Sequence, residues 1–176
     1  MDTIETFNYS ENGIDFTVNV VNFNEFSGFD DQWKMTDDHE GGVTVQNPQA
    51  CRNSYKFAIP LQYSLKERIA HLISQGDANP SANAYKAAQE ALERDLNASD
   101  YGFVVTATAN GITLLDGETL GCSFDYSYDD NETLIDAAKD VYKENGIDAE
   151  ALEAAKKAGA DLLSNIDGLK NILKVA

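Results

Sequence analysis

The feature that most restricts the fold is the alternation of apolar and polar residues in GIDFTVNV, residues 13–20. Every second residue from Ile14 to Val20 is apolar and those between are polar, which is the period of a strand with one buried face. The turn residues ENG come directly before this stretch, and the run IETFNYS comes before the turn. The pattern therefore predicts an N-terminal β-hairpin.

A second β region lies far along the chain, between residues 101 and 126. The runs YGFVVTA and LGCSFDY in this region each place apolar residues on one face. The Asn-Gly pair at 110–111 and the Asp-Gly pair at 116–117 are strong signals for two-residue hairpin turns, because both turn positions need positive φ. We expect two or three strands here.

Apolar residues recur at helical spacing in the remaining segments. Residues 61–76 and 79–97 predict a helical pair between the two β regions, and residues 131–146 predict a helix after the second one. The small-residue run at 148–159 and the Leu/Ile stripe at 162–173 predict two further helices. The order predicts an α+β fold, with an antiparallel sheet of four to five strands and helices on one face.

We expect residues 1–145 to form the α+β domain and residues 146–176 to form a C-terminal helical extension. The extension either packs on the domain or forms a dimer seam, and packing is the favoured alternative. Residues 24–53 are polar and show no clear period, so they predict a long loop. This loop holds the only tryptophan, Trp33, which either anchors a partner or pins the loop to the core, and the core role is favoured.

The negative charge of the chain is concentrated in two segments. Thirty acidic and thirteen basic residues give a formal net charge of −17, with −9 in residues 1–50, 0 in 51–100, −9 in 101–150 and +1 in 151–176. Nucleic acids and anionic membranes repel such a chain, which excludes both as direct partners. Two cysteines, Cys51 and Cys122, and an N-terminus without signal-peptide features predict the reducing host cytosol, where both thiols would be packed.

Four acids in the predicted helix at 131–146 recur every four residues, from Glu132 to Glu144. Neighbours at this spacing lie about 5–6 Å apart, and like charges there cost a few tenths of a kcal/mol per pair. A DNA duplex carries one phosphate charge per about 1.7 Å of axis with both strands counted. Carboxylates four residues apart on a helix have a comparable lateral spacing, so a DNA-like surface is physically feasible. The alternative is an ordinary solvated face, in which Lys139 and Lys143 pair with acids three residues earlier.

The acids of both segments form the predicted partner-binding surface. They are Asp30, Asp31, Asp37, Asp38, Glu40, Asp125, Asp129, Asp130, Glu132, Asp136, Asp140 and Glu144.

Other chemistries receive less support from the sequence. The acids around His39 offer oxygen donors for a hard cation, yet they lack the ligand spacing and internal glycine of a calcium loop. Neither His39 nor His71 lies in a catalytic motif, and no phosphate-binding loop or nucleophile motif is present in the sequence. We therefore predict no catalytic residue, no resident metal and no cofactor, and we expect that the protein is not an enzyme.

The run QWKMTDDHEGGV, followed by YKFAIPL, a helical pair and YGFVVTATANG, resembles a loose family of small proteins carried by phages and other mobile elements. Trp33, Asp38, His39 and Gly41 carry this resemblance, which covers about two thirds of the chain and has no counterpart after residue 149. The resemblance implies no activity and no site. It implies a context, because mobile elements often encode small acidic proteins similar to antirestriction and anti-CRISPR inhibitors. The comparison with those inhibitors rests on small size and negative charge alone.

Three hypotheses follow from the sequence. The first is a DNA-mimic inhibitor that binds the basic nucleic-acid-binding groove of a host defence protein of the CRISPR or restriction type. The second is a protein-protein adaptor or accessory protein that uses the aromatic loop and the C-terminal helix, and here a homodimer stays open. The third is a metal-dependent enzyme that uses the loop carboxylates.

Overall fold

The computed structural model describes residues 2–128 and 132–173. The chain divides into two compact units, each with its own hydrophobic core. The large-sheet unit comprises residues 1–24, 100–126 and 131–176, and the small-sheet unit comprises residues 25–99 and 127–130. The predicted boundary after residue 145 falls inside the large-sheet unit.

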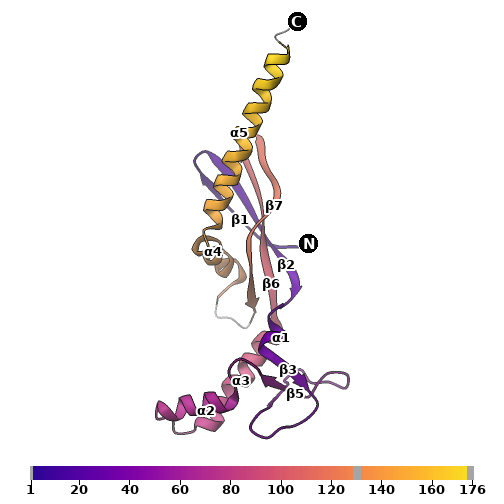
Figure 1. Ribbon diagram of the computed structural model, residues 1–176, viewed down its shortest axis with the longest axis vertical. Coiled ribbons are helices and arrows are strands. Elements are labelled where there is room, and N and C mark those ends of the chain that lie inside the picture. The colour runs from indigo at the N-terminus through magenta and orange to yellow at the C-terminus, as the bar shows by residue number, and fades with distance from the viewer. Residues whose placement is uncertain (1, 129–131, 174–176) are drawn as a thin grey trace. The chain divides into compact units, whose positions relative to one another are not determined.

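The large-sheet unit contains the antiparallel sheet that the sequence predicts, with its strands in the order β1-β2-β6-β7 (Figure 1). The strands are β1 (Thr3–Glu11), β2 (Ile14–Glu25), β6 (Ala98–Ala109) and β7 (Ile112–Ser127). Two of the expected hairpins form, the N-terminal one between β1 and β2 and the one at residues 110–111 between β6 and β7. Asn12 and Gly13 have φ of 51° and 77°, and Asn110 and Gly111 have φ of 50° and 78°, as a two-residue turn with two positive φ angles requires.

The second turn predicted in this region, at residues 116–117, is wrong. Strand β7 continues through it, and Gly117 and Gly121 take positive φ angles of 72° and 74° inside the strand. A glycine with positive φ can bend a strand without reversing it, so the Asp-Gly pair alone does not define a hairpin. Gly121 also lies where a Cβ would collide with the side chain of Ile147.

One face of this sheet is covered by α4 (Leu134–Glu144) and α5 (Ile147–Leu173). The ring of Tyr142 from α4 makes edge contacts with Phe7 and Phe103, at centroid distances of 5.4 and 5.1 Å. Its hydroxyl lies 3.2 Å from that of Tyr9. Burial of these phenols raises the pKa of Tyr142 strongly and that of Tyr9 less.

Two predicted C-terminal helices are one continuous helix. The sequence places a break near Gly159, but α5 runs without interruption from Ile147 to Leu173. A Cβ at Gly159 would lie 3.8 Å from Cδ2 of Leu114, so this glycine lies at the contact between α5 and the sheet. A glycine inside a helix costs about 1 kcal/mol of helix stability relative to alanine. The strong helix formers around it, alanines and lysines, offset this cost.

Part of the loop predicted at residues 24–53 folds into short elements of the small-sheet unit. Its elements are α1 (Phe29–Gln32), β3 (Trp33–Thr36), β4 (Val45–Gln46), β5 (Phe57–Pro60), α2 (Leu65–Ser74) and α3 (Pro80–Asn97). The three strands form an antiparallel sheet in the order β3-β5-β4, in which Trp33 pairs with Pro60 and Val45 with Ala58. These strands are too short for their periodicity to stand out from a loop in the sequence.

The predicted helical pair in the small-sheet unit is confirmed. Helix α2 starts with a capping box, in which the Ser64 hydroxyl accepts a hydrogen bond from the Glu67 N–H and the Glu67 carboxylate accepts one from the Ser64 N–H. The Ser64 hydroxyl also donates a hydrogen bond of 2.7 Å to the Glu67 carboxylate, and this bond together with the one from the Ser64 N–H lowers the pKa of Glu67. Helix α3 begins with Pro80 in its first turn, which is a favoured position because the first helical N–H groups have no intrahelical acceptor.

Candidate acidic binding surface

The acidic row predicted on one helix lies on α4 and is exposed. Asp136, Asp140 and Glu144 point away from the buried side of the helix, which carries Leu134 and Tyr142 among others. Glu132 is also exposed but lies just before the helix, whose N-cap is Thr133. The regular part of the row is therefore three carboxylates at four-residue intervals. We call these three residues the α4 acidic row.

Asp136 has a second role at the start of α4. Its backbone N–H donates a hydrogen bond to the Thr133 hydroxyl over 3.3 Å, and that hydroxyl donates one to the Asp136 carboxylate over 2.6 Å. A carboxylate in the first turn also interacts favourably with the helix dipole. Asp136 thus stabilises the helix, whereas neither Asp140 nor Glu144 makes a side-chain hydrogen bond within the described residues.

The lysines expected to neutralise this row do not pair with it. Lys139 and Lys143 are exposed on α4, but within residues 2–128 and 132–173 no ion pair joins either of them to Asp136, Asp140 or Glu144. The ion pairs that the solvated-face alternative offers are therefore not formed among these residues, although the face is exposed as that alternative expects.

Strand β7 brings further acids into the same unit. It is an edge strand of the large sheet, and Asp116, Glu118 and Asp125 on it are all exposed. The Tyr126 hydroxyl donates a hydrogen bond of 2.9 Å to the carbonyl of Glu132, which holds the end of β7 against the start of α4. The predicted residues Asp129 and Asp130 lie outside the described residues.

The acids of the first segment belong to the other unit. Asp30 and Asp31 lie on α1, while Asp37, Asp38 and Glu40 follow β3, and all five are exposed. The 37–40 segment is a turn, in which the Asp38 N–H donates to the Thr36 hydroxyl over 3.0 Å. The two predicted acidic tracks are thus carried by different compact units.

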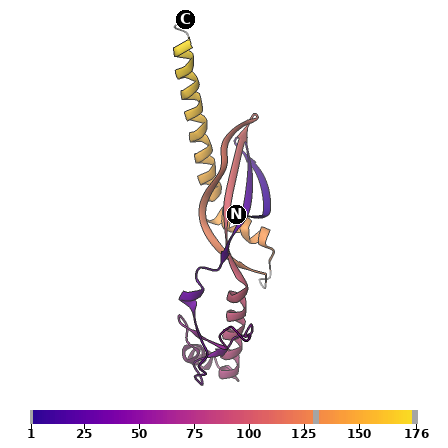
Figure 2. The same cartoon turned by 90° about the vertical axis from the view of Figure 1, so that its right-hand side faces the viewer.

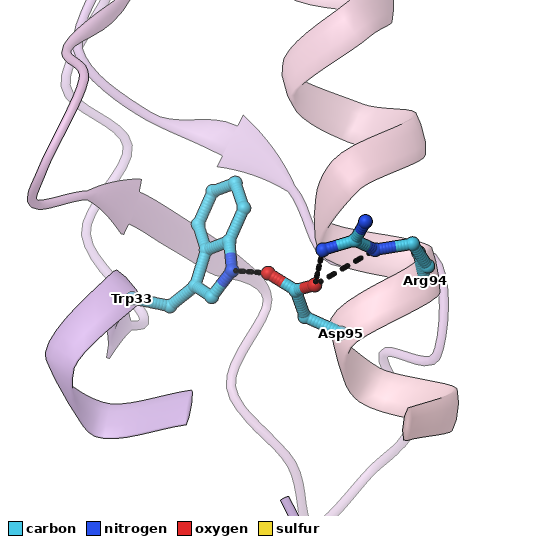
Figure 3. Close-up of polar contacts among 3 residues, drawn as sticks. All are labelled: Trp33, Arg94 and Asp95. Atoms are coloured by element: carbon cyan, nitrogen blue, oxygen red, sulfur yellow. Dashed lines mark hydrogen bonds and ion pairs between the residues drawn. The ribbon is translucent and has the colours of Figure 1, made fainter. Parts of the chain in front are cut away.

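Trp33 is a core residue, as favoured from the sequence. Its side chain is only 4% exposed and packs with Val45, Leu65 and Leu92 in the core of the small-sheet unit. The indole N–H donates a hydrogen bond of 2.7 Å to a carboxylate oxygen of Asp95 on α3 (Figure 3). The indole is consequently not available as a contact for a partner.

Asp95 is a buried carboxylate that the sequence analysis did not single out. It is 7% exposed, and its second oxygen accepts hydrogen bonds of 3.2 and 3.0 Å from the Arg94 guanidinium (Figure 3). A buried charge needs such partners to offset its lost hydration. One signal was present in the sequence, because Asp95 continues the apolar face of α3 at helical spacing from Ala84, Ala88 and Leu92.

The side chains considered for metal binding and catalysis do not converge. In the described residues no three His, Cys, Asp or Glu side chains gather as a metal ion would require. His39 packs its ring edgewise against Phe57 at 5.0 Å, and His71 lies near the end of α2 beside Gln75. The expectation that both cysteines are packed is wrong, since Cys51 and Cys122 are exposed. Hydrogen bonding with Ser54 lowers the pKa of the Cys51 thiol.

Comparison of the chain with protein-family models, with curated protein sequences and with solved structures gives no significant match. None of the helices in the described part of the chain combines the length and apolar composition that a membrane crossing requires.

Proposed function

We propose that the protein is a non-catalytic inhibitor that imitates nucleic acid and binds the basic groove of a nucleic-acid-binding host defence protein, of the CRISPR or restriction type. The observation that carries this proposal is the α4 acidic row. Asp136, Asp140 and Glu144 present three exposed carboxylates at about 5–6 Å intervals, without lysine partners. A basic groove that neutralises successive phosphates would meet a similar series of negative charges there.

The surrounding charge supports the same function. Up to residue 150 the large-sheet unit has fourteen acidic residues against two lysines, a net charge of −12. A field of this sign steers a basic partner toward the protein and makes association fast and dependent on salt. The acids from Asp30 to Glu40 form a second track, which the proposal assigns to the same partner.

The experiment is a competition assay against labelled DNA. A panel of purified restriction and CRISPR complexes is incubated with DNA and increasing amounts of the protein, at about 50 mM and about 200 mM salt. We expect displacement of DNA from at least one basic complex, with a much weaker effect at the higher salt. Absence of displacement at both salt concentrations would contradict the proposal.

A charge-matched pair of variants tests the α4 acidic row itself. Asp140→Lys/Glu144→Lys should reduce displacement by at least tenfold, because it replaces two carboxylates of the row. Glu90→Lys/Glu93→Lys on α3 changes the net charge equally, at two other exposed acids, and should retain most of the activity. If both variants lose displacement to the same extent, overall charge rather than the row is responsible. Far-UV circular dichroism verifies that each variant is folded.

The adaptor hypothesis names two contact surfaces, the aromatic loop and the C-terminal helix. Trp33 of the loop is buried and cannot contact a partner, whereas the C-terminal end of α5 exposes a series of large apolar side chains. Protein-protein association through that helix is compatible with the inhibitor function, since the α4 acidic row lies on a different helix.

A further inference from the structure

Helix α5 carries one apolar stripe along its whole length. Successive members lie three or four residues apart, which is the spacing of the a and d positions of a heptad repeat. The described members, in chain order, are Leu152, Ala155, Gly159, Leu162, Ile166, Leu169 and Leu173. A stripe of this period is suited to packing along another element over its full length.

Only the first part of the stripe is covered. Leu152 and Ala155 are 8% and 0% exposed and belong to the core of the large-sheet unit, where the sheet meets the helix as far as Gly159. Beyond that point the exposed fraction of the stripe residues rises along the helix. It is 39% at Leu162, 46% at Ile166, 58% at Leu169 and 73% at Leu173. In both views the end of α5 runs past the ends of the strands (Figures 1 and 2).

An uncovered helix of this kind lacks its main source of stability. All described side chains from Ala160 to Lys170 are exposed, so the described part of the unit covers little of this half of α5. Isolated helices shorter than about 12–15 residues are marginal in water, and helices in proteins depend on packing of an apolar face. A covering surface over Leu162 to Leu173 would supply that packing.

The charge distribution indicates what can cover it. Residues 151–176 carry a net charge of +1, whereas the rest of the chain carries −18. Repulsion between two copies is therefore concentrated in residues 1–50 and 101–150 and is weak along the C-terminal half of this helix, where residues 160–173 carry a net charge of −1. Lys156 and Lys170, two of the three lysines of α5, pair with Glu153 and Asp167 at 2.8 and 3.1 Å. Within the described helix this leaves one lysine, Lys157, to attract an anionic membrane.

The identities of the seam residues also fit a second copy. With Leu162 and Leu169 at d positions, the a positions of the exposed segment are Ile166 and Leu173. A β-branched residue at a with leucine at d favours two strands in parallel coiled coils, and Ile166 meets this rule. The apolar segment from Leu162 to Leu173 spans about 18 Å of helix at 1.5 Å per residue. An interface this short is at the low end of specific interfaces, which is the size class of weak and transient contacts.

We propose that the protein self-associates into a two-fold symmetric dimer, in which the C-terminal half of α5 packs against the same stripe of a second copy. The dimer is weak and forms at high micromolar concentration. Its driving force is apolar, and salt strengthens it by screening the repulsion between two chains of charge −17. Higher salt should thus strengthen the dimer, whereas it should weaken the proposed competition with DNA. The two proposals can therefore fail independently.

The test is sedimentation velocity of the full chain between about 1 µM and about 300 µM, at low and high salt. We expect the average mass to rise from that of one chain toward that of two, with the transition at lower concentration in high salt. Ile166→Ser/Leu169→Ser should shift the transition at least tenfold higher in concentration. Hydrogen exchange of residues 147–155 verifies that the packed half of α5 is intact in the variant.

A matched control is available on another surface. Leu61 and Ile73, at 50% and 61% exposure, reproduce the residue types and nearly the exposure of Leu169 and Ile166. Leu61→Ser/Ile73→Ser should leave the transition unchanged. A single-chain mass at every concentration, an equal effect of the control variant, or association that requires phosphatidylcholine vesicles would each overturn the proposal.

Discussion

The two compact units stabilise their cores in different ways. The large-sheet unit is centred on aromatic side chains, among which the hydroxyls of Tyr9 and Tyr142 lie 3.2 Å apart. The small-sheet unit is centred on Trp33, whose indole N–H depends on the buried carboxylate of Asp95. The first core depends on apolar area and ring packing, and the second also depends on one charged hydrogen-bond acceptor.

The units also carry their acids differently. In the large-sheet unit the α4 acidic row has a regular spacing because the residues share one helix face. In the small-sheet unit the acids are divided between the four-residue helix α1 and the turn after β3. The evenly spaced carboxylates of the α4 acidic row present a defined pattern to a partner. The acids of α1 and of residues 37–40 add negative charge without a regular spacing.

Phe103→Ala should have the largest effect on stability. The ring is fully buried and stacks on Phe124 at 5.4 Å, so its removal should lower the free energy of unfolding by about 3–5 kcal/mol. Hydrogen-exchange mass spectrometry should show faster exchange in β6, with little change in α3 of the small-sheet unit. Equal loss of protection in both would mean that the two units unfold as one.

Asp95→Ala should have an intermediate effect, confined to the small-sheet unit. It leaves the buried Trp33 N–H without its acceptor, which should lower the free energy of unfolding by about 1–3 kcal/mol. Tryptophan fluorescence during urea unfolding measures this unit selectively, because Trp33 is the only tryptophan. Asp95→Asn keeps an acceptor oxygen and should cost less; equal losses in both variants would contradict the role of the hydrogen bond.

Alkaline pH should have the smallest effect, and it should act on the large-sheet unit. The pKa of Tyr142 is raised in the fold by burial above its ordinary value of 10.0, so the folded state holds this proton more tightly than the unfolded chain. The resulting stability is fully present below about pH 10 and is lost as pH rises toward the folded pKa, by at most about 1.4 kcal/mol per pH unit for one proton.

Urea unfolding at pH 9, 10 and 11, followed by far-UV circular dichroism, measures this dependence. Tyr142→Phe keeps the ring packing against Phe7 and Phe103 and removes the titrating group. The variant should therefore lose less stability between pH 9 and pH 11 than the original chain. An identical pH dependence in both proteins would show that Tyr142 is not the group responsible.

Several elements could be predicted from the sequence because their signals are local. The alternation around Phe16 and Val18, the Asn-Gly turn at 110–111 and the apolar spacing of α2 and α3 depend only on neighbouring residues. The acidic spacing on α4 was also local and correctly placed three carboxylates on an exposed face. The second turn at 116–117 and the break near Gly159 were wrong, because glycine permits a turn or a helix end without imposing either.

The sequence by itself determined the α+β class, the antiparallel sheet, the helical pair and the exposed spacing of Asp136, Asp140 and Glu144. Only the tertiary structure decided that residues 24–53 contribute strands to a second sheet, that Trp33 bonds to Asp95, and that α5 is covered as far as Gly159 and exposed beyond it. The physical reason is that periodicity reports which side of an element is apolar. Which surface covers that side depends on residues far away in the chain, and the local pattern does not contain them.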